Sequence, residues 1–292
     1  MECPEPGIYE SVPFAEYCRW PCVNNSSLSP LLRSPAHYRA AMDNRVESSS
    51  DALRFGRFLH DSTLDPSVVD KYYAIEPDLT HGIDAKVPRA TKLYRERYAA
   101  FLETIGDREL VSHEWYSATQ QMLRSLYMHE LSRAWLTMPG ECEVSVIWDD
   151  AATGIRCKAR FDRWCRGEPL VCDLKTTMDV TRFNESIGRF RYHRQAAFYV
   201  DAANTLTGKA HAFGLIAIEK ERPFAVRAAY LDSGSIAAGR REYRRLLHEL
   251  QRCMESNTWP GPDDPGAWTC PAWAAEQEEP VTLTIGGREV SV

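Results

Sequence analysis

The sequence predicts an α/β protein with a mixed central sheet, and the order of its segments carries this prediction. Residues 1–139 show mainly helical patterns, and residues 140–232 change to the two-residue alternation of strands in the order β-β-β-α-β. Residues 233–292 open with a long charged helix and end in a tail rich in Trp and Pro, which no pattern assigns. We expect one domain of 292 residues, with strands and helices packed around a single core.

Capping signals place the N-terminal helices. Ser29-Pro30 and Ser34-Pro35 each combine an N-cap residue with a proline at the first helical position. Ser50 is the expected cap of a third helix that carries His60 near its centre. The helices expected here cover residues 31–33, 36–42, 86–105 and 117–138, together with the one that follows Ser50.

Alternation of apolar and polar residues marks the strands of the middle region. In residues 141–148, Cys142, Val144, Val146 and Trp148 alternate with polar residues, which is typical of a strand with one polar face. The same alternation recurs nearby. The strands expected in this region cover residues 141–148, 155–164, 170–176, 210–219 and 224–231, with helices over 188–204 and 233–256.

Three acids and a lysine stand on the polar faces of the first three strands. They are Glu143, Asp162, Asp173 and Lys175, and the last two are two residues apart and so point the same way. If the strands are neighbours in a meander, these groups converge. Carboxylates held together are costly without a counter-cation. Oxygen ligands in a small site suit Mg²⁺, with Mn²⁺ as a substitute.

Such a site would suit phosphodiester hydrolysis. A bound Mg²⁺ lowers the pKa of its water and stabilises charge on phosphoryl oxygens, and a lysine beside it can stabilise the developing charge. Single acids on strands are usually solvated surface groups, however, and a DxK pair occurs by chance in many chains. The prediction depends on the combination of this pair with the acid on the preceding strand and with Gln195 and Tyr199 on the following helix.

At this point the chain resembles a known group of enzymes. The segment LVCDLKTT at 170–177 resembles the core motif of the RecB-type PD-(D/E)xK nucleases, GIRCKARFD at 154–162 their preceding hairpin, and QAAFY at 195–199 their QxxxY motif. The segments SPLLRSPAHY at 29–38 and LRFGRFLH at 53–60 are similar to the RecE/exonuclease VIII-like phage exonucleases. The resemblance implies a restriction-endonuclease-like core in a single nuclease domain. The proline of the motif name is replaced by Phe161.

The resemblance also implies residue roles. Lys175 matches the catalytic lysine, and Glu143 matches an acid on the first core strand that contacts a second metal or acts through water. A plain alternative for His60 is a helix histidine that faces the core. The metal ligands implied by the resemblance are His60, Asp162, Asp173 and the backbone carbonyl of Leu174.

Several polar and basic residues are candidates for DNA contact. Gln195 and Tyr199 lie four apart and share one helix face, which either organises the site or binds the DNA backbone, or simply packs. Ser27 and Ser29 lie near a helix start that could hold a terminal phosphate, with N-capping as the alternative for Ser29. Solvated helix faces are the alternative for the arginines. The arginines considered are Arg33, Arg54, Arg57 and Arg194.

The leading functional hypothesis is an exonuclease that degrades one strand of linear duplex DNA. The resemblance implies the 5′-to-3′ direction, a ring-shaped trimer or tetramer, a role in phage recombination and a single-strand annealing protein as partner. Two alternatives remain: a structure-specific or restriction-type endonuclease on the same fold, and a catalytically silent DNA-binding module. The intact pair of Asp173 and Lys175 argues against the silent module.

Composition sets outer limits on these hypotheses. The net charge of −6 and pI near 5.8 argue mildly against DNA binding, unless the positive charge is segregated on one surface. The chain shows no signal peptide, no apolar run of about 18 residues and no Walker A motif, which predicts a cytoplasmic protein without membrane or ATP binding. The resemblance implies a phage or prophage gene in a bacterial host. Its nine cysteines are expected to be reduced thiols, most of them buried as small hydrophobes.

Overall fold

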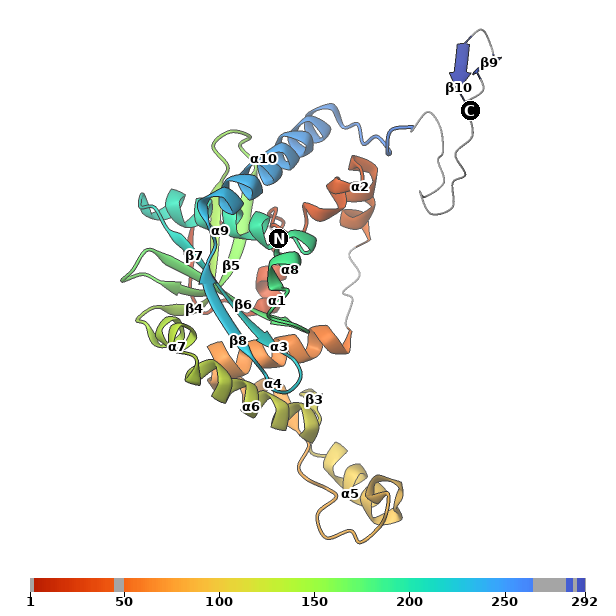
Figure 1. The fold of residues 1–292 in the computed structure, drawn as a ribbon, viewed down its shortest axis with the longest axis vertical. Coiled ribbons are helices and arrows are strands. Elements are labelled where there is room, and N and C mark those ends of the chain that lie inside the picture. Colours follow the sequence, from red (N-terminus) through yellow and green to blue (C-terminus); the bar gives the residue numbers. More distant parts are fainter. Residues whose placement is uncertain (1–2, 45–49, 265–281, 286–287, 292) are drawn as a thin grey trace.

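A six-stranded sheet forms the centre of the protein (Figure 1). The computed structural model describes residues 3–44, 50–264, 282–285 and 288–291. Neighbouring strands run antiparallel except β6 and β7, which are parallel, so the expected α/β class with a mixed sheet is confirmed. The strands, in sheet order, are β1 (Gly7–Tyr9), β4 (Glu141–Asp149), β5 (Arg156–Cys165), β6 (Leu170–Thr177), β7 (Ala212–Glu219) and β8 (Val226–Tyr230).

Helices cover both faces of this sheet (Figure 1). Two small sheets are added: β2 (Tyr73–Ile75) pairs with β3 (Glu109–Val111) in parallel, and β9 (Thr282–Ile285) pairs with β10 (Arg288–Ser291) in antiparallel fashion. The α-helices are α1 (Phe14–Arg19), α2 (Pro35–Asp43), α3 (Asp51–Leu64), α4 (Val69–Tyr72), α5 (Lys92–Leu102), α6 (His113–Met128), α7 (Glu130–Thr137), α8 (Phe183–Arg189), α9 (Tyr192–Thr207) and α10 (Ser233–Ser256). The 3₁₀ helices are η1 (Ser29–Leu32), η2 (Pro66–Val68) and η3 (Pro88–Ala90).

Two expected helices are each divided in the structure by a local capping feature. The helix expected over 117–138 is α6 followed by α7, because the His129 ring accepts a hydrogen bond from the Ser132 backbone at 3.2 Å and starts a new helix. The helix expected over 188–204 is α8 followed by α9, with Arg191 in the left-handed region at φ 59° between them. Both breaks depend on single side chains or dihedrals that periodicity does not report.

The N-terminal caps are mostly those that the sequence predicts. The Ser34 hydroxyl accepts from the His37 backbone, and the Ser50 hydroxyl accepts from the Leu53 backbone, each at 3.3 Å. Ser29 differs, because the residue at the N-cap of η1 is Leu28, and the Ser29 hydroxyl instead receives a hydrogen bond from Arg194. The capping alternative for Ser29 is therefore wrong.

The apolar core is divided by the sheet into two layers. On one face α9 packs through Ala196 and Phe198 against strands β4 and β5, and α10 covers α9 from outside. On the other face Phe55 and Leu59 of α3 pack with residues of α6 and α7 against β6 and β7. These two layers hold α9 and α3 on opposite sides of β5 and β6, which is what positions the candidate site.

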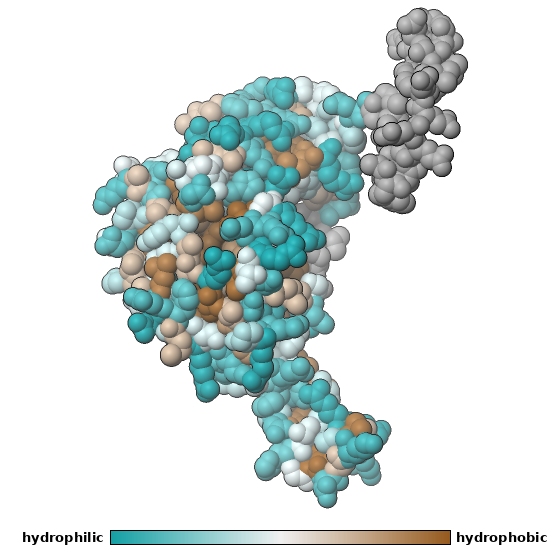
Figure 2. Space-filling model, in the orientation of Figure 1, coloured by the Kyte–Doolittle hydropathy of each residue, from teal (hydrophilic) through white to brown (hydrophobic). Residues whose placement is uncertain are grey.

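A slender arm projects from this body (Figures 1 and 2). It contains η3 and α5 and is joined to the body through the paired strands β2 and β3. None of the residues of α5 is buried, and Val87 and Leu93 are exposed. Figure 2 shows hydrophilic and hydrophobic residues mixed on the surface of the arm.

The cysteines are mostly free, with one exception. Cys157, Cys165, Cys172 and Cys253 are buried thiols, as expected. Cys3 and Cys22 instead form a disulfide, so the expectation of reduced thiols is wrong for this pair. It joins the segment before β1 to the segment that follows α1, and sequence spacing gives no sign of it because the two cysteines are 19 positions apart. Cys270 lies outside the described residues. Among those residues no helix is long and apolar enough to cross a membrane.

Helices α9 and α10 approach each other closely at Gly239. A Cβ atom added there would lie 2.0 Å from the His193 carbonyl oxygen, which belongs to the backbone and cannot move aside freely. Nearby, the Arg240 guanidinium binds the Asp201 carboxylate at 2.6 Å, and the Tyr243 hydroxyl donates to the same carboxylate. The position of α9, which carries Gln195, therefore depends on a residue without a side chain in α10.

We expect Gly239→Ala to lower the free energy of unfolding by about 1–3 kcal/mol, because the added methyl group forces α10 away from α9. Gly188→Ala in α8 is the matched control. That position has open space around it, so the higher helix propensity of alanine should raise stability by about 0.5–1 kcal/mol. Urea unfolding followed by circular dichroism measures both. Equal stability of the two variants would contradict this account of the α9–α10 contact.

Candidate active site

Three acids occupy one row across neighbouring strands. In the antiparallel pair β4–β5, Cys142 lies opposite Arg163 and Val144 opposite Phe161, so Glu143 and Asp162 face each other between them. In the pair β5–β6, Arg163 lies opposite Cys172, and the next position along brings Asp162 level with Asp173. The strands are neighbours as the sequence analysis required, and Glu143, Asp162 and Asp173 converge on this row.

Regular strand pairing is interrupted at the same row. Backbone pairing in β4–β5 omits Glu143 and Asp162, and pairing in β5–β6 ends at Arg163 and Cys172. Glu143 has φ 55°, a left-handed conformation that costs a non-glycine residue on the order of 1–3 kcal/mol. Beyond the row, the Leu174 backbone N–H donates to the Asp162 carboxylate at 2.8 Å instead of to a backbone carbonyl of β5. The opening between β5 and β6 is thus lined by acids.

Helix α3 brings His60 to this opening. The His60 Nδ1 atom lies 3.5 Å from the Asp162 Oδ2 atom. One ligand atom each from His60, Glu143 and Asp162 can be chosen so that all three lie within 4.8 Å of one another. The backbone of Leu174 also acts on this ring, where it tends to raise the pKa of His60. His60 therefore meets acids from residues about a hundred positions later in the chain, as the resemblance implied.

Asp173 and Lys175 form the other half of the site. Asp173 is 1% exposed, and its Oδ1 atom accepts a hydrogen bond from Gln195 of α9 at 2.8 Å. Its Oδ2 atom lies 2.6 Å from Lys175 Nζ in an ion pair that lacks hydrogen-bond geometry. Tyr199, on the same face of α9, packs against Phe161 with the two ring centroids 5.1 Å apart. Gln195 thus orients the Asp173 carboxylate from the face of α9. The predicted DNA contact of the half-buried Tyr199 stays a prediction.

Burial and like charges shift the ionisation of the acids. Burial, and then the neighbouring Asp173, raise the pKa of Asp162 to about 8. Burial, and then Asp162, raise the pKa of Glu143. Burial and the charge of Lys175 lower the pKa of His60, so the ring is neutral at pH 7 and able to bind a metal. Burial opposes the charge of Lys175, but Asp173 and Asp162 outweigh it and raise its pKa.

The donor set fits a divalent cation. Two of the three groups are carboxyls with raised pKa values, and a bound cation would relieve the repulsion between their charged forms. The third is a neutral imidazole that can bind the same ion. Carboxylate-rich sites suit Mg²⁺ or Mn²⁺. The buried Asp173 Oδ2 atom, which receives no hydrogen bond, supplies a further oxygen beside the group. Asp173 is not part of the three-residue group, and its carboxylate is held by Lys175 and Gln195. The ligand roles of Asp173 and of the Leu174 carbonyl stay predictions.

The basic residues proposed for DNA contact fall into two groups. Arg194 is 1% exposed, and its guanidinium binds Ser29 at 2.7 Å and Asn25 at 2.9 Å. The predicted DNA contacts of Arg194 and of the Ser29 hydroxyl are therefore replaced by a structural link between α9 and η1. The Ser27 hydroxyl donates to the Asn24 carbonyl within a local turn. Arg54 binds Glu109 at 2.7 Å, and Arg57 lies 3.8 Å from the same carboxylate. Arg33 and Arg57 are exposed and stay candidates for phosphate contact.

Two functional neighbours were not predicted. Arg160 Nε lies 2.5 Å from Glu143 Oε2 and holds that carboxylate toward the row. Tyr192 presents its ring to Lys175, with the Lys175 Nζ atom 5.2 Å from the ring centroid. Arg160 shares the polar face of its strand with Asp162, so alternation could have indicated it. No sequence signal indicated Tyr192.

The fold and this row of acids with its lysine define a protein of the PD-(D/E)xK nuclease superfamily. Residues 24–265 match the family described as PDDEXK-like domain of unknown function (DUF3799), and the chain belongs to that family.

Solved structures with a similar fold are known. A crystal structure from Eubacterium rectale, named "Putative exonuclease", superposes with a TM-score of 0.55 at 13% sequence identity, over 89% of this chain and 90% of that chain. A second crystal structure, of SSO0001, covers 68% of this chain and 86% of its own at 18% identity, but its TM-score of 0.28 carries no argument. No curated protein matches the chain. The first likeness supports the fold alone.

The raised pKa of Asp162 predicts a pH-dependent stability of the metal-free protein. The unfolded chain releases this proton near pH 4, whereas the folded protein keeps it until about pH 8. Asp162 therefore destabilises the fold increasingly as pH rises between these values. His60 acts in the opposite sense, because its lowered pKa favours folding as pH rises toward about 6.5. The difference between wild type and Asp162→Asn isolates the carboxyl group.

In EDTA, we expect the Tm of Asp162→Asn minus that of wild type to grow from pH 5 to pH 8. Saturating Mn²⁺ should raise the Tm of wild type, most strongly at pH 8, and raise that of the variant much less. Asp78→Asn is the control, since the pKa of this exposed carboxyl is lowered by Thr80 and it does not titrate in this window. Differential scanning fluorimetry measures the Tm of wild type, Asp162→Asn and Asp78→Asn. A Tm difference that is constant with pH would contradict the assignment.

Proposed function

We propose that the protein is a Mg²⁺-dependent exodeoxyribonuclease that degrades one strand of linear double-stranded DNA in the 5′-to-3′ direction. The observation that carries the nuclease part is the convergence of Glu143, Asp162, Asp173 and Lys175 with His60 at the opening between β5 and β6. Membership in a PDDEXK-like family supports the same reaction class. Mn²⁺ is expected to substitute for Mg²⁺ in this donor set.

The chain's own residues have separable parts in the hydrolysis. When bound, the cation supplies charge stabilisation on the phosphoryl oxygens and a lower pKa for attacking water. His60, Glu143 and Asp162 would hold it, with Asp173 beside them. Lys175, ion-paired to Asp173 at 2.6 Å, is positioned to orient the water and to stabilise negative charge as water adds to phosphorus and a P–O bond breaks. Gln195 fixes the Asp173 carboxylate through its 2.8 Å hydrogen bond.

The exonuclease part of the proposal rests on likeness. The N-terminal segments around Ser34 and His60 resemble the RecE/exonuclease VIII-like phage exonucleases, and the Eubacterium rectale protein carries the name of an exonuclease. The same resemblance supports the 5′-to-3′ direction, a role in phage-type recombination and a single-strand annealing protein as partner. A cytoplasmic location in a bacterial host, with a phage or prophage gene, belongs to the same proposal.

A ring-shaped trimer or tetramer completes the proposal. A protein of net charge −6 needs a segregated positive surface to hold a polyanion. Closing several identical subunits around the duplex brings exposed cations of each subunit, such as Arg33 and Arg57, into one field. An encircled duplex also cannot dissociate sideways, which favours long runs of digestion.

Hydrolysis itself is tested with linear duplex DNA in Mg²⁺ or EDTA. We expect wild type to release nucleotides in Mg²⁺ only, and Asp173→Ala and Lys175→Ala each to reduce the rate by at least about a hundredfold, because charge stabilisation of this kind contributes that much. Lys175→Ala should keep most of the Mn²⁺-induced rise in Tm, whereas Asp173→Ala should lose part of it. A wild-type rate in either variant would disprove the site assignment.

Covalently closed circular duplex is the control that separates the exonuclease from an endonuclease. We expect it to stay intact under conditions in which linear duplex is digested. Conversion of the circle to nicked or linear DNA would favour the structure-specific or restriction-type endonuclease. Binding of DNA with no hydrolysis of either form would leave a silent binding module.

The ring is tested by mass. We expect multi-angle light scattering at micromolar concentration to give three or four times the monomer mass of 33.3 kDa, because only a closed assembly encircles the duplex. The same mass should persist when DNA is added, apart from the mass of the DNA. A monomer mass both with and without DNA would exclude the ring and leave a nuclease that dissociates after each cut.

A further inference from the structure

Two exposed aromatic side chains flank the row of acids. Phe14 of α1 is 53% exposed, and Phe190, between α8 and α9, is 55% exposed. Large aromatic residues exposed to this extent lose much of the free energy that burial would give them. Each of the two is connected to a different side of the site by a short series of contacts.

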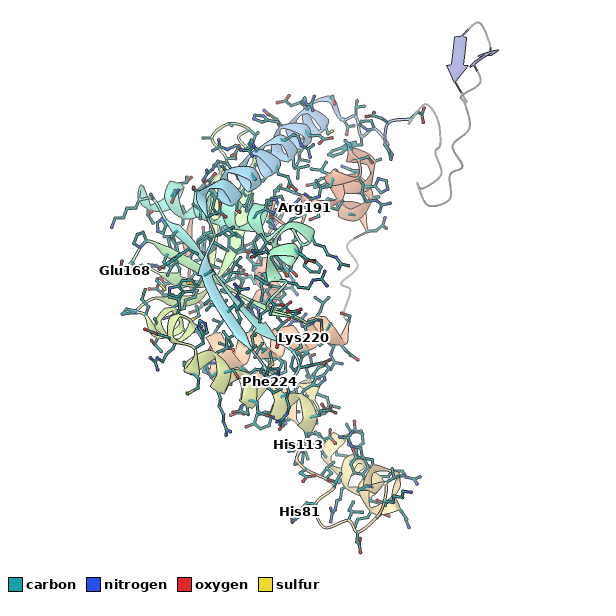
Figure 3. All side chains as sticks on the ribbon, in the orientation of Figure 1. His81, His113, Glu168, Arg191, Lys220 and Phe224 are labelled. Atoms are coloured by element: carbon teal, nitrogen blue, oxygen red, sulfur yellow. A yellow bond between two sulfur atoms is a disulfide. The ribbon has the colours of Figure 1, made fainter. Side chains whose placement is uncertain are left out.

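Phe190 is connected to the lysine side. Its ring centroid lies 5.7 Å from that of Tyr192, whose ring is in turn contacted by Lys175 Nζ at 5.2 Å. Between them Arg191, labelled in Figure 3, holds a left-handed backbone at φ 59°. It binds Glu242 of α10 at 3.2 Å, so an ion pair to a second helix fixes this corner. The Arg189 guanidinium lies 5.4 Å from the Phe190 ring. The corner therefore presents an aromatic face and a cation together.

Phe14 is connected to the acid side. The Arg160 guanidinium, which binds Glu143, lies 5.9 Å from the Phe14 ring centroid, and the Arg57 guanidinium lies 6.0 Å from it. Helix α1 is held in place from its C-terminal end, where the buried Lys158 ammonium donates to the Tyr17 carbonyl at 2.7 Å and to the Trp20 carbonyl at 2.8 Å. Phe14 thus stands on a fixed helix beside the row.

We propose that Phe14 and Phe190 are stacking surfaces for unpaired bases on the two sides of the scissile phosphate. The inference rests on the proposed nuclease activity and narrows its substrate: the strand that enters the site is single-stranded there, either free or frayed from a duplex end. Stacking suits any base, because every base has a π face, and the neighbouring arginines suit the phosphates between them. In intact duplex the bases are stacked on each other and cannot use these rings.

The test is binding of a single-stranded oligonucleotide with nuclease-resistant phosphorothioate linkages, measured by fluorescence anisotropy in EDTA. Phe14→Ala and Phe190→Ala should each weaken binding at least about fivefold, which is the lower end for loss of one base–aromatic stack. Binding of a blunt duplex should change less than about twofold. Phe190→Trp should bind the single strand as tightly as wild type, because tryptophan also offers a ring for stacking. The fluorescence of 2-aminopurine placed in the oligonucleotide should be quenched less by the alanine variants than by wild type.

Tyr230→Ala is the matched control. Tyr230 is 57% exposed and also contacts an aromatic ring, that of Trp135 at 4.9 Å, but it lies on edge strand β8 rather than beside the acids. Its loss should leave binding of both substrates unchanged. Three outcomes would overturn the proposal. They are wild-type binding by both phenylalanine variants, an equal loss of binding for single strand and duplex, and a change in the mass of the assembly in either variant. A change in mass would assign these rings to a contact between protein copies.

The outcomes for this inference and for the proposed function are separable. If the phenylalanine variants lose single-strand binding but wild type hydrolyses no DNA in Mg²⁺, the nuclease proposal fails and the stacking surfaces stand. If wild type hydrolyses linear DNA but the variants bind single strands normally, the stacking proposal fails alone.

Discussion

The repulsion among three carboxylates on one row of the sheet is the constraint on which the rest of the structure depends. Asp162 lies level with both Glu143 and Asp173, and the strands separate there instead of pairing. Compensation comes from four directions: Arg160 on Glu143, the Leu174 backbone N–H on Asp162, and Lys175 with Gln195 on Asp173. The pKa of Asp162 nevertheless stays raised, first because this carboxyl is buried and then because Asp173 lies beside it. A cation would remove the repulsion that remains.

The helices that carry Gln195 and His60 to the site are held by packing that has no part in the chemistry. Gln195 stands on α9, whose position is set by the contact of Gly239 with the His193 backbone and by Arg194, buried against η1. His60 stands on α3, which is fixed to β6 and β7 by Phe55 and Leu59 in the opposite core layer. The site therefore lies where two independently packed layers meet through an opening in the sheet. This arrangement permits ligands from both faces to reach one small volume.

The sequence could predict what depends on local periodicity and on motif. Alternation located β4, β5 and β6 and hence the convergence of Glu143, Asp162 and Asp173, and caps such as Ser34 and Ser50 were correctly read. It could not predict features that depend on distant partners. The disulfide between Cys3 and Cys22, the burial of Arg194 and the left-handed conformation of Glu143 each result from tertiary contacts. A run of basic residues before Gln195 has the same composition whether it faces phosphate or the interior, so charge alone misassigned Arg194.

Several arginines are engaged in contacts within the protein, which limits how an acidic protein could bind DNA through charge. Arg163 donates to the Trp135 carbonyl at 2.8 Å, Arg194 to Ser29, and Arg240 is paired with Asp201, so these charges serve the fold and are not available to phosphates. Among the described residues, the exposed Arg57 and Arg189 lie beside Phe14 and Phe190. Affinity that rested on phosphate charge alone would therefore be modest and would fall steeply with salt. Aromatic stacking is far less sensitive to salt than ion pairing. In the proposed ring of subunits, every subunit would present the same small patch, so a weak contact with DNA would be made several times. Either would allow a chain of net charge −6 to retain a polyanion while its acids stay concentrated around the reacting phosphate.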